Sequence, residues 1–195
     1  MSNLMISLLA AAGIAFAGVA GAADNKTMSR DAYKAQKDRV EAQYKADKER
    51  CSSMTGNAKD VCQAEVKGQE KVAKAELEAN YKNTDKARND ARVAKADADY
   101  DVAKEKCDDL SGNQKDVCVK QAKAAHTQAK SGAKVAKVDR KTSANTADKR
   151  ADVRKEARDD TRDAQYKVAV EKCDAMSGAA KDQCVKDAKM HYGKT

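Results

Sequence analysis

The chain has 195 residues and a formal net charge of +8, and 36% of its residues are charged while only 4% are aromatic. Proline is absent and Ala, Lys, Asp, Glu, Arg and Gln dominate, so the composition favours helices and offers no stretch that resembles a strand. Because Leu, Ile, Val and Phe are scarce, the composition argues against a single compact globule with a large apolar core.

The N-terminal segment 1–22 is typical of a targeting signal. The apolar run from Leu4 to Ala20 is short and rich in Gly and Ala, and Ala20-Gly21-Ala22 fits a cleavage site with small residues. We therefore predict a cleaved secretory signal peptide over 1–22, although the segment lacks Lys or Arg near Met1; a retained anchor is the alternative. Processing would leave no transmembrane span, and the mature protein would be periplasmic or secreted.

A cysteine-containing segment then occurs three times, over 44–67, 100–123 and 166–189. Each copy has a Tyr, then a Cys seven residues later, then Thr/Ser-Gly, Lys-Asp and a second Cys eleven residues after the first. This pattern uses all six cysteines of the chain, which are Cys51 and Cys62, Cys107 and Cys118, and Cys173 and Cys184.

The eleven-residue spacing predicts a hairpin in each copy. On one continuous helix the two sulfurs would lie about 16 Å apart along the axis, whereas a disulfide needs Cα atoms within about 4.4 to 6.8 Å. The chain must therefore reverse between the two cysteines, and the Gly of Thr/Ser-Gly tolerates the left-handed conformation that ends a helix. We also expect Asn57 and Asn113 to cap the returning helices.

The predicted fold class is all-α, with three disulfide-stapled αα-hairpin repeats in an elongated or coiled-coil-like arrangement and no sheet. The repeats would cover 23–82 with Cys51–Cys62, 83–142 with Cys107–Cys118, and 143–195 with Cys173–Cys184. If the chain reverses near 83–85 and 142–146, it forms six helices of about 20 to 28 residues; if it runs straight through, the helices are 50 or more residues long. Ser131-Gly132 is a further weak point in the helical pattern. Helix-mediated oligomerisation, bridges between molecules and a zinc site made of cysteines from different repeats remain alternatives.

A run of basic residues follows the second repeat's turn. From Val117 to Lys141 the only acidic residue is Asp139. This stripe could contact an anionic polymer, a lipid headgroup or an acidic protein, or it could be a solvated helix face. Nucleic acid is disfavoured because the expected export removes the usual target. The candidate contact residues are Lys120, Lys123, Lys130, Lys134, Lys137, Arg140 and Lys141.

The sequence offers no catalytic motif. Its two histidines, His126 and His191, lie outside any metal-binding or nucleophile-activating pattern and are interpreted as surface residues. The mixed cluster from Arg154 to Asp163 is interpreted as interspersed surface ion pairs. We therefore predict no catalytic residues, no metal and no cofactor, and expect that the protein is not an enzyme.

The segment from Tyr100 to Lys120 resembles exported Ala/Lys-rich helical repeat proteins of Gram-negative bacteria, some of which are described as TolA-like cell-envelope biogenesis proteins. The resemblance implies a periplasmic or cell-envelope structural or protein-interaction role, with envelope proteins as partners. The alternative is a periplasmic module that sequesters anionic ligands or surfaces through the basic stripe.

Overall fold

The structure is a computed structural model that describes residues 28–140 and 147–194. These residues form six α-helices and one short 3₁₀ helix, η1, and contain no strand. The predicted all-α fold is therefore confirmed. The α-helices are α1 (Arg30–Ser52), α2 (Gly56–Lys82), α3 (Asp85–Lys106), α4 (Gly112–Asp139), α5 (Ala147–Cys173) and α6 (Gly178–Tyr192), and η1 covers Cys107–Asp109.

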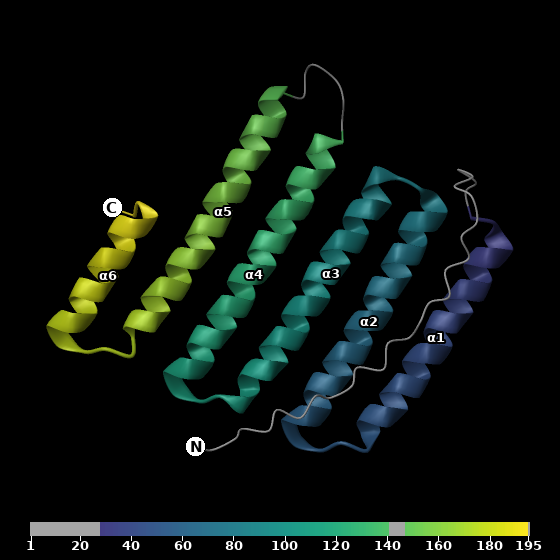
Figure 1. The fold of residues 1–195 in the computed structure, drawn as a ribbon, viewed down its shortest axis with the longest axis horizontal. Coiled ribbons are helices and arrows are strands. Elements are labelled where there is room, and N and C mark those ends of the chain that lie inside the picture. Colours follow the sequence, from purple (N-terminus) through teal and green to yellow (C-terminus); the bar gives the residue numbers. More distant parts are fainter. Residues whose placement is uncertain (1–27, 141–146, 195) are drawn as a thin grey trace, which may run out of the picture.

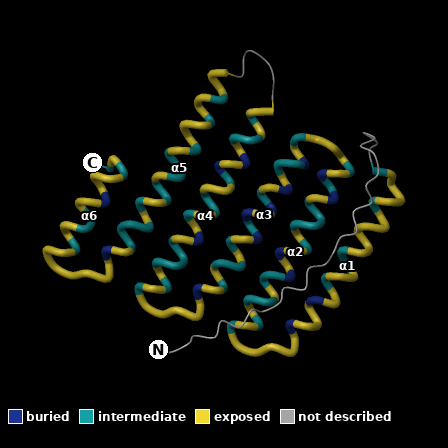
Figure 2. The backbone as a smooth tube through the Cα atoms, viewed as in Figure 1, coloured by how far each residue is buried: buried dark blue, intermediate teal, exposed yellow. Residues whose placement is uncertain are grey.

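The six helices lie side by side in one antiparallel layer (Figure 1), and each packs mainly on the helices that precede and follow it in the chain. The few buried residues are spread along the helices, and most other residues are exposed or half-buried (Figure 2). The architecture is therefore a row of three hairpins, with a narrow core in each seam instead of one central core.

All three disulfides form within their own repeat, as the spacing predicted. The Cα–Cα distances are 5.6 Å for Cys51–Cys62, 5.6 Å for Cys107–Cys118 and 5.7 Å for Cys173–Cys184. The turn glycines have positive φ, for example 54° at Gly112, which a residue with a Cβ rarely adopts. The three stapled turns lie along the same edge of the layer (Figure 1).

The chain also reverses between α2 and α3, so the six-helix alternative is correct there. Asn83 ends α2 in the left-handed conformation with φ 49°, and the Thr84 hydroxyl accepts a hydrogen bond from the Ala87 backbone nitrogen at the start of α3. Residues 141–146 lie outside the described residues, but α4 and α5 pack against each other as an antiparallel pair.

Three details differ from the sequence-based expectations. Helix α4 runs through Ser131-Gly132 without interruption, since backbone hydrogen bonding continues where the pattern is weak. Helix α6 has 15 residues and is shorter than predicted. Asn57 and Asn113 do not cap the returning helices, because these helices already begin at the preceding glycines.

Small residues allow the helices to approach closely. A Cβ added to Gly68 of α2 would lie 3.0 Å from the Cβ of Ala98 on α3, and Ala79, Ala87 and Ala91 form a buried cluster in the same seam. Since alanine buries little apolar area, such seams gain modest hydrophobic free energy per residue. The predicted signal peptide, 1–22, lies outside the described residues; within 28–140 and 147–194 no helix combines the length and apolarity needed to cross a bilayer.

Candidate interaction surfaces

The predicted basic stripe does not form a single face of α4. Lys120 and Lys134 extend toward α5, where their Nζ atoms lie 3.5 Å from Glu171 and 3.1 Å from Glu156. Lys130 extends toward α3 and lies 3.8 Å from Asp97. The stripe is thus divided between the two seams that flank α4.

Most of the described stripe residues are paired with carboxylates of neighbouring helices. Arg140 also contacts α3, with its guanidinium 3.8 Å from Asp85. Lys123 and Lys137 are exposed and form no ion pair with the residues that the structure describes; Lys141 lies outside them. Exposed pairs of this kind each contribute little to stability, but together they join α4 to the helices on both sides.

A polar cluster lies in the seam between α3 and α4. His126 Nε2 is 2.7 Å from Asp97 Oδ1, and the His126 ring stacks on Tyr100 with centroids 4.8 Å apart. Burial raises the pKa of the Asp97 carboxyl, but hydrogen bonds from His126 and Lys71 and the charges of Lys71 and Lys130 outweigh it, so the pKa is lower than usual. His126 is a partly exposed residue, with a side chain that is 21% exposed, and its aromatic and carboxylate partners come from α3.

The stapled edge carries a row of exposed apolar side chains. Met54, Leu110 and Met176 occupy the same position of each repeat, three residues after the first Cys, and are 43%, 40% and 48% exposed. The preceding Cys51, Cys107 and Cys173 are 0%, 0% and 1% exposed. Each apolar tip residue is therefore half-exposed beside a buried sulfur.

A groove runs along the seam between α4 and α5 on one face of the layer. It forms a shallow hollow of about 620 Å³ that is open to solvent. Gly132, Val135 and Ala136 of α4 and Ala157 of α5 line it with apolar surface, and Arg154, Arg158 and Arg162 of α5 also line it. No atom lies within 4 Å of the place where a Cβ on Gly132 would stand, so the hollow is open above this residue.

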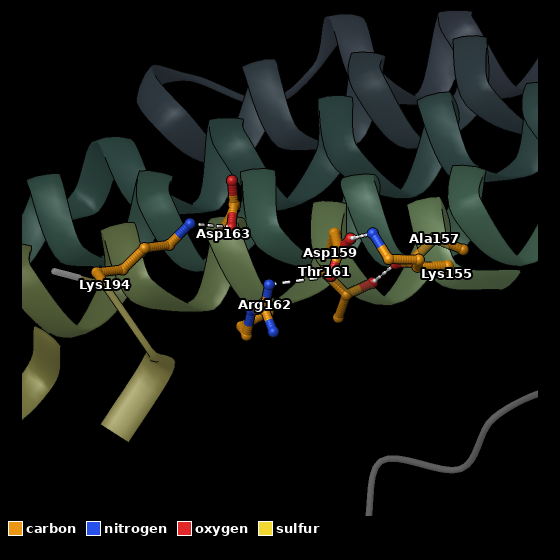
Figure 3. Close-up of polar contacts among 7 residues, drawn as sticks. All are labelled: Lys155, Ala157, Asp159, Thr161, Arg162, Asp163 and Lys194. Carbon is orange, nitrogen blue, oxygen red and sulfur yellow. Dashed lines mark hydrogen bonds and ion pairs between the residues drawn. The ribbon is translucent and has the colours of Figure 1, made fainter. Parts of the chain in front are cut away.

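The α5 residues around this groove form the ion pairs expected of the mixed cluster, except at one position. Lys155 and Arg162 both bind Asp159, at 3.2 and 2.9 Å, and Lys194 binds Asp163 (Figure 3). Arg154 binds Asp139 of α4 at 2.9 Å. Arg158 is exposed and forms no ion pair with the described part of the chain.

Sequence reasoning missed this groove. The residues that line it look like ordinary surface positions in the sequence, and only the packing of α4 on α5 brings Gly132 beside Ala157 and the arginines. The available signals were the glycine inside a helical pattern and the four-residue spacing of Arg154, Arg158 and Arg162. The chain matches no family model, no curated protein and no solved structure.

Proposed function

We propose that this chain is a non-enzymatic protein-interaction scaffold of an oxidising compartment, the periplasm or cell envelope. The observation that carries the proposal is the single layer of six helices in which each helix packs mainly on its chain neighbours. Such a layer exposes two broad faces and therefore offers far more surface for its mass than a globule does. A surface of this kind suits contacts with other macromolecules.

The disulfides support the choice of compartment. Each bridges the two cysteines of one repeat, and the described residues contain no free cysteine. Disulfides persist mainly in exported proteins, since cytosolic thiols are kept reduced. The signal-like segment 1–22 and the resemblance to exported Ala/Lys-rich envelope proteins point the same way.

Photo-cross-linking in intact cells tests the scaffold function. A photoreactive amino acid placed at exposed positions of different helices, such as Arg92 on α3 and Lys123 on α4, is expected to give discrete adducts with envelope proteins. Adducts that still form when the sample is washed in about 1 M salt before irradiation indicate contacts that are not purely electrostatic, because the Debye length at that salt concentration is about 3 Å. Absence of any adduct at every exposed position contradicts the proposal.

Sequestration of anionic ligands by the basic stripe is the second candidate, and Lys123 and Lys137 are the stripe residues that favour it. They are exposed and have no acidic partner among the described residues, whereas Lys120, Lys130, Lys134 and Arg140 are paired. Charge-driven binding predicts salt-labile retention on anionic vesicles or polysaccharide that is lost when Lys123 and Lys137 become Gln. Retention unchanged by this double substitution rejects the second candidate.

A further inference from the structure

We propose that the groove between α4 and α5 is a docking site for a helical peptide segment with an acidic face. The inference rests on the proposed scaffold function and specifies one partner-binding surface and the chemistry of its occupant. Three observations carry it: an open apolar floor, a row of arginines along one side, and a glycine inside a helix that neither close packing nor backbone conformation within the described chain requires.

The glycine is Gly132, inside α4. A glycine in a helix interior costs about 1 kcal/mol relative to alanine, so it is normally explained by close packing or by a left-handed backbone. Neither holds here, since no atom lies within 4 Å of its Cβ position and its φ is not among the positive values. The corresponding residue of the first hairpin, fourteen positions after the second Cys, is Glu76. What Gly132 provides is an unobstructed groove floor.

The arginines supply the charge. Arg154, Arg158 and Arg162 recur every four residues on α5, so they lie one above the other and span about 12 Å along the helix. Arg154 and Arg162 already have carboxylate partners, at 2.9 Å each, and Arg158 between them has none in the described chain. A guanidinium binds carboxylates in a bidentate manner, so Arg158 presents an unused site for an acidic side chain beside an apolar floor.

The shape of the groove favours a helix as the occupant. The hollow follows the axes of two packed helices, and the arginines beside it repeat with helical spacing. A carboxylate on a docked helix can therefore bind Arg158, while carboxylates four residues before and after it share Arg154 with Asp139 and Arg162 with Asp159. Small apolar residues on the adjoining positions of that helix would fill the floor above Gly132, as in other complexes where an amphipathic helix lies in a groove.

A direct binding measurement tests the proposal. The probe is a fluorescein-labelled peptide that forms about four helical turns, with Glu at three positions four residues apart and Ala and Leu on the adjoining face. Fluorescence anisotropy reports its binding to the full, oxidised protein. Gly132→Leu places a side chain in the groove floor, at a Cβ position that no other atom crowds, and is expected to weaken binding at least about tenfold. Arg158→Gln is expected to weaken it about threefold to fivefold, which is the upper part of the range of a single exposed ion pair.

The matched control is Arg92→Gln. Arg92 occupies the position of Arg158 in the preceding repeat, fifteen residues before the first Cys, and does not line the groove. Its substitution removes the same charge and is expected to change affinity less than twofold. Circular dichroism checks that each variant keeps its helices, and Gly132→Leu should be at least as stable as the natural chain.

Four results overturn the proposal. Two concern the peptide: no binding of the acidic peptide, or equal binding of a peptide with Lys in place of Glu. The other two concern the variants: an undiminished peptide affinity of Gly132→Leu, or equal losses of peptide affinity from Arg92→Gln and Arg158→Gln. Phosphatidylglycerol vesicles are tested separately. If the vesicles bind in a way that depends on Gly132 and Arg158 while the peptide does not bind, the groove is assigned to lipid. Failure of the peptide leaves the cross-linking test of the scaffold function unaffected, because Arg92 and Lys123, which that test uses, do not line this groove.

Discussion

At the residue scale, glycines of this chain occupy two different backbone environments within one helix. Gly112 begins α4 with a φ of 54°, whereas Gly132 lies in the interior of the same helix with ordinary backbone angles. Neither has an atom within 4 Å of its Cβ position. Steric crowding is therefore absent at both sites, and backbone conformation alone distinguishes them.

This difference predicts opposite effects of one substitution. Gly112→Ala should destabilise the protein by about 1 kcal/mol, because a residue with a Cβ is strained at positive φ. Gly132→Ala should stabilise it by up to about 1 kcal/mol, because alanine is the better helix former in a helix interior. Urea denaturation followed by circular dichroism measures both, and equal signs for the two variants would contradict the assigned backbone geometry.

A second residue-scale prediction concerns acid stability. Burial acts to raise the pKa of Asp97, but the hydrogen bonds from His126 and Lys71 outweigh it, so the pKa is lowered in the folded protein. A carboxyl with a depressed folded pKa stabilises the fold above its unfolded pKa, and this contribution disappears as the pH falls through the folded pKa. Asp97→Asn should therefore be less stable than the natural chain at pH 7 and lose less stability on acidification to about pH 2.5.

Unfolding midpoints in urea at several pH values measure this effect. Asp101→Asn is the control on the same helix, because Asp101 is exposed and forms no ion pair with the described residues. It should keep the acid profile of the natural chain. Identical profiles for Asp97→Asn and the natural chain would show that the contacts of Asp97 with α2 and α4 do not stabilise the fold.

At the element scale, the disulfides and the inter-hairpin contacts have separate roles. Each disulfide joins the two helices of one hairpin, whereas Asn113 at the start of α4 joins two hairpins by donating from Nδ2 to the Glu171 carbonyl of α5 at 2.8 Å. The corresponding residues are Asn57 in the first hairpin, whose amide nitrogen has no hydrogen-bond partner among the described residues, and Ala179 in the third. The third hairpin, at the end of the row, thus lacks an amide at this position.

Reduction is expected to weaken the hairpins strongly. Closing a ring of twelve residues stabilises the folded chain by roughly 3 kcal/mol in the chain-entropy model, and the Ala-rich seams have little apolar area with which to compensate. Thermal melts followed by circular dichroism should show a lower midpoint with reductant. A variant with all six cysteines changed to Ala should melt at the lower temperature whether or not reductant is present.

How much could be predicted from the sequence depended on the range of the interaction. The hairpin turns followed from local chemistry, since the Cys spacing and Thr55-Gly56 specify a reversal within one repeat. The partners of the charged residues could not be predicted from local chemistry. Lys130 and Lys134 are four residues apart, yet they contact different helices, α3 and α5. The packing order of the helices decides such pairings, and it cannot be read from charge counts along one helix.

At the scale of the whole molecule, the outer edge of α6 differs from the edges that form seams. Six residues after the second Cys, α2 has Gly68 in close contact with α3, α4 has Ala124, and α6 has Met190, which is 63% exposed. Another helix could not pack on α6 as closely as α3 packs on α2, because the Met190 side chain would occupy the contact.

The single layer also makes a prediction about shape in solution. A layer one helix thick is about 10 Å deep, and six helices spaced about 9 Å apart make it about 55 Å wide. Its longer helices, such as α2 and α5 with 27 residues, make it about 40 Å high at 1.5 Å rise per residue. A slab of these dimensions has a radius of gyration of about 19 to 20 Å, whereas a compact domain of about 170 residues would have about 16 Å.

Small-angle X-ray scattering of the oxidised, processed protein distinguishes the two shapes. For the layer we expect a radius of gyration of about 19 to 20 Å and scattering that decays at intermediate angles as it does for a flat particle. Light scattering on the same sample should give the mass of a monomer. A second copy stacked face to face would double both the mass and the thickness, so the pair of measurements separates stacking from a different fold. A monomer with the smaller radius, that of a compact domain, would mean that the row folds back on itself and buries one of the faces that the scaffold function requires.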